Sequence, residues 1–189
     1  MNVVIEKVFP MPCSADTAWQ FLQNIEGVGN CMPGAKITER VDEKNHKGTV
    51  SVKVGPASMS FRGNIEVREV DAATRTLHLI GTGSDVTGTS GASMDLVATV
   101  KDTGGTTCEL VGKSEVGMTG KAAAFGGRVM NSVAEQILKQ FAANFAVQVE
   151  ALQSQQLAPV PVQSEMNGLA LAWAVVRDWW HGLFARKSA

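Results

Sequence analysis

The sequence contains few of the residues on which enzymatic catalysis usually depends. Its 189 residues include no tyrosine, three histidines and three cysteines. We predict His46 in a turn, His78 on the outer side of a strand and His181 near the C-terminus, so each histidine is expected to be isolated. No Gly-x-Ser-x-Gly motif is present. We therefore predict no catalytic residue and no enzymatic activity.

The cysteines are equally uninformative. Cys13, Cys31 and Cys108 are far apart in sequence and odd in number, so no disulfide framework is indicated, and no pair has the spacing of metal ligands. We expect a reduced cytosolic compartment and no bound metal. The charged pair Glu6-Lys7 interrupts the N-terminal apolar segment, so we expect no signal peptide.

The net charge is −1, so the sequence lacks the excess of basic residues that is typical of nucleic-acid-binding proteins. The Gly-rich run at residues 81–88 contains a Gly-x-Gly, but the pattern after it predicts a strand and not a helix. We therefore do not expect a site that binds a nucleotide phosphate at the N-terminus of a helix.

The clearest positive signal is alternation of apolar and polar residues. It predicts a strand at 2–9, ended by Pro10 and Pro12, then a helix at 15–24 after the N-cap Ser14, and a helical turn at 27–32. Short Gly-, Asp- and Asn-containing breaks then predict an antiparallel meander. Its six strands are expected at 35–43, 46–54, 57–70, 74–86, 90–102 and 106–118.

At about 122–153 apolar residues recur with the spacing of a helix, which predicts one long helix. The stripe has a four-residue spacing and consists of Phe125, Val129, Val133, Ile137, Phe141, Phe145 and Val149. The element order predicts an α+β fold, with a curved seven-stranded antiparallel sheet around one long helix.

Five methionines are expected to face the interior of this domain: Met32, Met59, Met94, Met118 and Met130. Methionine fills irregular and adaptable space. Two interpretations stay open, namely an ordinary filled core and a deformable apolar pocket between sheet and helix.

The C-terminal region has a different composition. Residues 154–166 contain two prolines and several glutamines and are expected to form a linker. The pattern of residues 167–189 predicts a separate amphipathic helix. Its apolar run is too short to span a bilayer, so we expect the helix to lie in the membrane interface. Docking on the domain or on a partner is the alternative. Its expected membrane-binding residues are Leu169, Trp173, Val176, Trp179, Trp180, Leu183, Phe184, Arg186 and Lys187.

Several segments in combination resemble the CoxG family of carbon monoxide dehydrogenase proteins, within the START-like (SRPBCC) superfamily. The resemblance covers about residues 1–150, and the tail resembles the membrane-directed helix of some members. The segments are GNCMPGA at 29–35, KGTVSVKVGP at 47–56, FRG at 61–63, DAATR at 71–75, and TGK at 119–121 followed by FGGR at 125–128.

The resemblance implies a helix-grip domain at 1–153 with a hydrophobic cavity. It also implies an accessory role beside a molybdenum hydroxylase of the CO dehydrogenase type, on the cytoplasmic face of the membrane, with an isoprenoid quinone (menaquinone or ubiquinone) as transported ligand. Two alternatives are a recruitment adaptor without ligand and a cyclase- or hydrolase-like enzyme. The expected cavity lining is Met32, Met59, Phe61, Leu79, Met94, Leu96, Met118, Phe125, Val129, Met130, Val133 and Ile137.

Overall fold

The computed structural model describes residues 1–55 and 57–157. Contacts divide the chain into a unit of Met1–Gln155 and a second unit of Gln156–Ala189. The linker expected at 154–166 falls outside the described residues from 158 onward, as does the whole amphipathic helix expected at 167–189. No helix among the described residues is long and apolar enough to cross a membrane.

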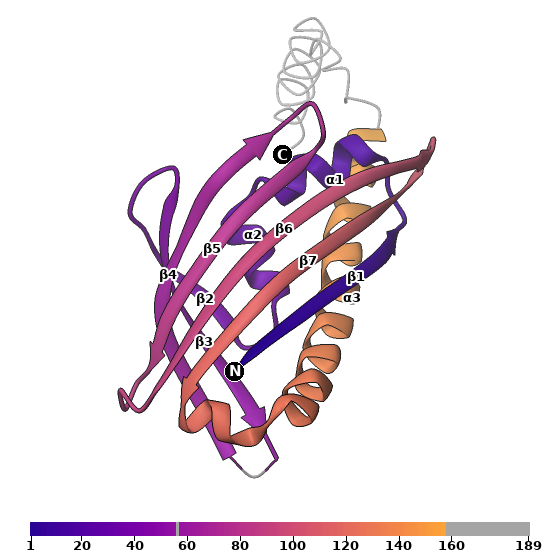
Figure 1. The fold of residues 1–189 in the computed structure, drawn as a ribbon. Helices are drawn as coiled ribbons and strands as arrows, with labels where there is room; N and C mark the ends of the chain where they lie inside the picture. Colours follow the sequence, from indigo (N-terminus) through magenta and orange to yellow (C-terminus); the bar gives the residue numbers. More distant parts are fainter. Residues whose placement is uncertain (56, 158–189) are drawn as a thin grey trace, which may run out of the picture. The chain divides into compact units, whose positions relative to one another are not determined.

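Seven strands form one antiparallel sheet in the order β1-β7-β6-β5-β4-β3-β2, and helix α3 lies across its concave face (Figure 1). This confirms the predicted fold class for the domain. The elements are β1 (Asn2–Met11), α1 (Ala15–Leu22), α2 (Ile25–Cys31), β2 (Ala35–Arg40), β3 (Asn45–Val54), β4 (Ala57–Asp71), β5 (Thr76–Asp85), β6 (Ser90–Gly104), β7 (Thr107–Gly120), the 3-10 helix η1 (Lys121–Phe125) and α3 (Gly127–Leu157).

Strand β1 differs from the prediction because it continues through Pro10 to Met11. β1 lies at the edge of the sheet and pairs only with β7, where Pro10 is opposite Glu109. An edge strand tolerates a proline because one side of its backbone needs no ladder hydrogen bonds. The expectation that proline ends a strand therefore placed the end of β1 too early.

Both N-terminal helices are capped by side chains. The Ser14 Oγ accepts a hydrogen bond from the Thr17 backbone N–H at 3.2 Å, as its position predicted. The Asn24 Oδ1 accepts one from the Gly27 N–H at 3.0 Å, so α2 begins two residues before the expected helical turn. These caps satisfy N–H groups that the first turn of a helix leaves unpaired.

The long helix is preceded by a break that the apolar stripe did not predict. Gly126 separates η1 from α3 and has a φ of +78°. Only glycine adopts this left-handed region without a steric cost, so the chain turns here before α3 begins. At its other end α3 runs to Leu157, four residues beyond the predicted end.

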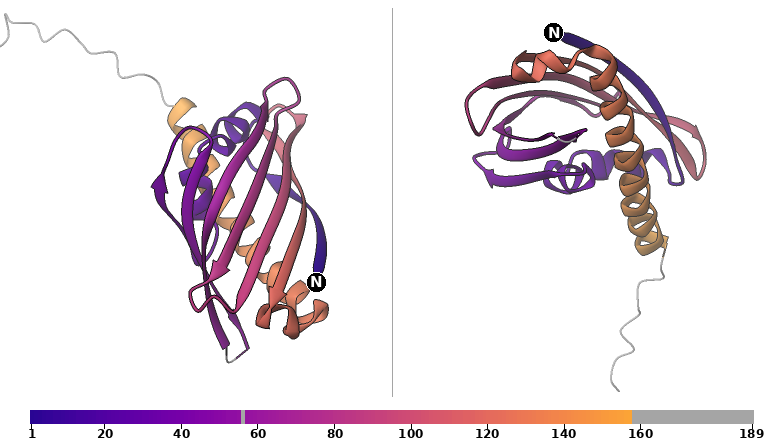
Figure 2. Two further views of the ribbon diagram at one scale, coloured as in Figure 1. Left: turned by 60° about the vertical axis from the view of Figure 1, so that its left-hand side comes forward. Right: turned by 90° about the horizontal axis from the view of Figure 1, so that it is seen from below.

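The core is concentrated where α1 and the C-terminal part of α3 meet the sheet (Figure 2). Phe145 of α3 is fully buried, and its ring lies edge-on to Phe21 of α1 with 5.0 Å between centroids. Phe141 extends this aromatic contact, at 5.7 Å from Phe145. The aromatic cluster therefore joins α3 to α1 at this end of the domain.

Candidate ligand-binding site

The concave face of the sheet has a packed end and an open half. At the packed end, the inward-facing residues Leu77, Ala98, Val100 and Leu110 are all buried. Toward η1, most inward positions are only half-buried, which shows that α3 covers this part of the face incompletely. We call these ten residues the open half: Val50, Val52, Met59, Ile65, Ala92, Met94, Leu96, Ser114, Val116 and Met118. Two of them, Ile65 and Leu96, border the packed end and pack against its core cluster.

The open half is almost entirely apolar. Nine of its ten side chains carry no hydrogen-bonding group, and Ser114 is the exception. Three are methionines, whose flexible thioethers adapt to ligands of different shape. The open half therefore presents a half-buried apolar surface on the side of the sheet that faces α3.

Strand register places all six predicted sheet residues of the lining on the concave face. Met59, Met94, Leu96 and Met118 belong to the open half. Phe61 and Leu79 are each 8% exposed, and Leu79 belongs to the packed core. The expected lining therefore divides between the open half and the packed interior.

The predicted lining residues outside the sheet are placed less uniformly. Met130 is buried, while Phe125, Val133 and Ile137 are half-buried. Met32 follows α2 and packs on the core cluster. Val129 is 41% exposed, which differs from its expected inward position. Val129 belongs to α3, and a four-residue spacing turns by about 40° around an ideal helix at each step, so Val129 lies about 160° away from the buried Phe145.

Two surface hollows occur on the opposite, convex face. The larger, of about 490 Å³, is lined by outward-facing strand residues such as Lys47, Asn64, Glu66 and Thr82, and His46 also contributes to its lining. These polar side chains do not suit an apolar ligand. The convex hollow is therefore not the pocket that the sequence predicts.

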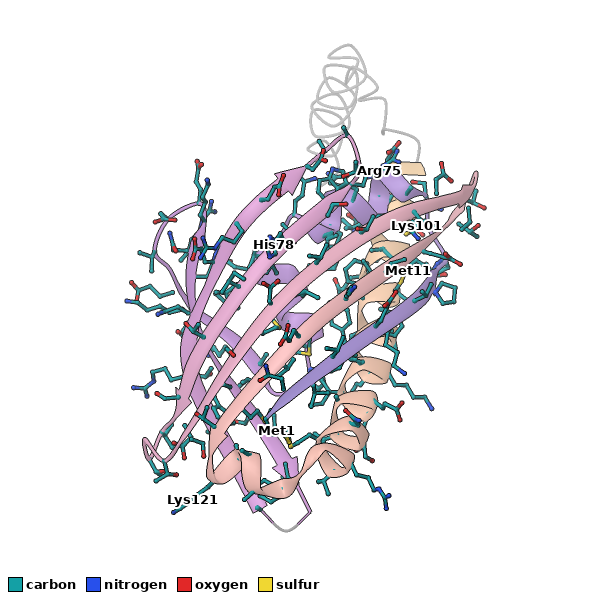
Figure 3. The ribbon with its side chains drawn as sticks, viewed as in Figure 1. Met1, Met11, Arg75, His78, Lys101 and Lys121 are labelled. Carbon is teal, nitrogen blue, oxygen red and sulfur yellow. The ribbon has the colours of Figure 1, made fainter. Side chains whose placement is uncertain are left out.

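Two histidines have surroundings that sequence reasoning missed. His78 is not isolated, because its Nε2 lies 2.8 Å from the Asp95 Oδ1 on the convex face (Figure 3). His46 lies in strand β3 and not in a turn, is 3% exposed, and faces inward opposite Ile65. The alternation of His46, Gly48, Val50 and Val52 was the signal for this strand position.

The His46 Nδ1 has no hydrogen-bond partner among the described residues. A buried polar atom without a partner costs free energy and requires an explanation. The described residues contain no group of three side chains able to hold a metal ion.

Cys13 and Cys108 are also brought together, although 95 residues separate them in sequence. Their Sγ atoms lie 3.9 Å apart at the packed end, and both are free thiols. Burial raises the pKa of both thiols, and that of Cys108 to about 12. Because the thiolate is the reactive form, these cysteines are poor nucleophiles.

Comparison with known proteins identifies the family. A family model that describes the CoxG subunit of carbon monoxide dehydrogenase matches residues 9–150. No curated protein sequence matched the chain.

Solved structures share the fold at low sequence identity. A conserved protein from Geobacillus kaustophilus aligns with a TM-score of 0.70 at 17% identity, covering 80% of this chain and 96% of that one. An aromatase/cyclase from a Streptomyces species gives 0.58 at 14%, covering 79% and 94%. A START superfamily protein from Mycobacterium smegmatis gives 0.56 at 15%, covering 79% and 98%. These similarities show a START-like fold and leave function to be argued from the site.

Proposed function

Because this chain belongs to the CoxG family of carbon monoxide dehydrogenase proteins, we propose that it is a non-catalytic accessory protein of a CO-dehydrogenase-type molybdenum hydroxylase and carries an apolar ligand to that enzyme. The observation that carries the proposal is the open half of the concave face. Its apolar side chains are half-exposed beside α3, whereas the other end of the same face is densely packed.

The ligand in this proposal is an isoprenoid quinone, menaquinone or ubiquinone. A quinone accepts two electrons and two protons to become a quinol, so it is a suitable acceptor for electrons leaving an oxidoreductase. Its long isoprenoid chain is insoluble in water and favours apolar contacts such as those of Met59, Met94 and Met118. A soluble enzyme would need a carrier to reach such an acceptor.

Membrane attachment completes the proposal. The tail expected at 167–189 would hold the protein on the inner face of the cytoplasmic membrane, where quinone is dissolved. The part of the expected linker that follows α3, residues 158–166, would let the domain move between membrane and enzyme.

The test is to extract ligand from the purified full-length chain and identify it by mass spectrometry. Uptake is measured in parallel from liposomes that contain menaquinone. Val133→Trp places a large side chain on the half-buried side of α3, whereas Val147→Trp places the same side chain at a position that is 62% exposed.

We expect quinone in the wild type and the Val147→Trp protein, and a large loss in the Val133→Trp protein. Absence of quinone or other lipid from the wild type, together with no uptake, would contradict the proposal. If the Val133→Trp protein loses its ligand but still supports electron transfer by the enzyme, the function is membrane recruitment without ligand delivery.

A second candidate is an enzyme acting on an apolar substrate, and His46 is the observation that favours it. His46 is an ionisable side chain buried at an inward position, with an unpartnered Nδ1. The two functions differ in the chemistry of the recovered ligand. A carrier gives the same ligand masses in the wild type and the His46→Gln protein, whereas an enzyme gives substrate in the variant and product in the wild type.

A further inference from the structure

Strand β1 carries one cation on its inward side. Register with β7 places Val3, Ile5, Lys7, Phe9 and Met11 on the concave face, and all except Lys7 are apolar. The Lys7 Nζ lies 3.2 Å from the Glu135 Oε1 of α3, so the pair spans the gap between the edge strand and the helix. The Lys7 side chain is 42% exposed and that of Glu135 is 68% exposed, so this ion pair lies at the solvent-exposed rim of the concave face.

The position beside Lys7 on β7 is occupied by Gly112. Gly112 faces inward and is paired in register with Lys7 on one side and Ala98 on the other. A Cβ atom added to Gly112 would meet no other atom within 4 Å. Its backbone φ is not positive, so turn geometry gives no reason for glycine here. The absent side chain instead leaves space in front of the sheet at this point.

Ser114 is the next inward residue of β7 and supplies the one hydroxyl of the open half. It is half-buried and lies between Ile5 of β1 and Leu96 of β6 in the register. In the register, Lys7 is therefore paired with Gly112 and Ser114 is the next inward residue of the same strand, so the two residues beside this space carry an ammonium group and a hydroxyl group. Both can donate hydrogen bonds, and an ammonium group cannot accept one.

We propose that Lys7, Gly112 and Ser114 form a polar subsite that binds a carbonyl oxygen at the ring end of the carried ligand, whose apolar remainder lies along the open half. The inference rests on the proposed carrier function and specifies where the ligand's oxygen-bearing end is held. Glu135 already balances the charge of Lys7, so the subsite favours a neutral carbonyl oxygen over a carboxylate. A quinone ring has this chemistry.

The experiment measures dissociation constants for the full-length chain by displacement of the fluorescent apolar probe phenylnaphthylamine. Decylubiquinone is the carbonyl-bearing ligand, and decylbenzene is a ring with the same alkyl chain and no oxygen. The variants are Lys7→Met, Ser114→Ala and Gly112→Leu. Lys113→Met is the matched control, because Lys113 lies on the same strand between Gly112 and Ser114 and faces outward.

We expect Lys7→Met and Ser114→Ala each to weaken decylubiquinone binding by about threefold to tenfold, the effect of losing one hydrogen bond in a partly exposed site. Both should leave decylbenzene binding unchanged, and Lys113→Met should change neither ligand. Gly112→Leu should weaken both ligands, because its side chain fills the space. Circular dichroism checks that each variant is folded.

Two results would overturn the subsite for different reasons. If the wild type binds decylubiquinone but the Lys7→Met and Ser114→Ala proteins bind it equally well, the subsite is wrong and the carrier function stands. If the folded wild type binds neither ligand, the carrier function fails and the subsite fails with it. A Glu135→Gln variant distinguishes a carboxylate ligand from a carbonyl ligand. If the subsite prefers a carboxylate, this variant would bind oleate more strongly than the wild type.

Discussion

The thiols of Cys13 and Cys108 lie 3.9 Å apart at the packed end of the domain, where both side chains are at most 1% exposed. Burial is the main cause of the raised pKa of Cys108, and the neighbouring Cys13 adds to it. Neither thiol therefore ionises readily in the folded state. This contact has consequences for alkaline stability and thiol reactivity.

The first prediction concerns alkaline pH. An unfolded cysteine ionises near its ordinary pKa of 9.0, whereas Cys108 in the folded state ionises at about 12. Between these values the folded state holds the proton and the unfolded state does not, so the free energy of unfolding falls as pH rises. Urea denaturation at pH 7 to 11 should show this fall, with a smaller slope for Cys108→Ser. An equal slope in both proteins would contradict the assignment.

The same burial predicts slow modification by a thiol reagent at pH 8. Cys13, Cys31 and Cys108 are all buried, so labelling should follow unfolding of the native state. A fast-reacting thiol in the native protein would mean that the packed end opens more readily than its burial indicates.

The second prediction concerns the attachment of α3. Phe145→Ala removes a fully buried ring that contacts Phe21 and Phe141, and should lower the free energy of unfolding by about 3–5 kcal/mol. Val147→Ala, two residues away and 62% exposed, should change it by less than about 0.5 kcal/mol. Urea denaturation measures both. Similar losses in the two variants would mean that the packed end does not hold α3.

The third prediction concerns the break between η1 and α3. Gly126 has a φ of +78°, so Gly126→Ala should destabilise the domain by about 1 kcal/mol. Gly127→Ala is the control, because Gly127 begins α3 without a positive φ and alanine favours the helix. We expect that substitution to be neutral or slightly stabilising. Thermal and urea unfolding should therefore separate two adjacent glycines, with a loss of stability at Gly126 alone.

These glycines show what the sequence could and could not predict. Strand alternation depends on neighbouring residues, and it located the strands of the sheet within a few residues. The break at Gly126 depends on a backbone angle that two adjacent glycines do not disclose. The apolar spacing continues from Phe125 to Val129 across the break, so the sequence predicted one helix. The expected inward Val129 failed for another reason, since a four-residue spacing drifts around the helix within α3 itself.

The alternation of apolar and polar residues could not predict contacts between residues that are distant in sequence. The Cys13–Cys108 contact and the pairing of Lys7 with Glu135 depend on strand order and on the position of α3. The strand position of His46 was within reach of the sequence, because His46 was the first residue of the strand predicted at 46–54 and alternates with Gly48 and Val50, although it was also assigned to the turn before that strand. The sequence predicted that Met59, Met94 and Met118 face inward, and the register places them on the concave face. It left a filled core and a pocket as alternatives.

The last prediction concerns the C-terminal tail, whose residues 167–189 lie outside the described part of the chain. On an ideal helix Trp179 and Trp180 fall on the apolar side and Arg177 on the polar side. Flotation with vesicles of anionic lipid should recover the full-length chain, and removal of residues 167–189 should abolish recovery. The double substitution of Trp179 and Trp180 by alanine should weaken partitioning about tenfold or more, because two large apolar side chains are lost. Arg177→Ala should have a much smaller effect, and flotation of the truncated chain would place the membrane contact in the domain itself.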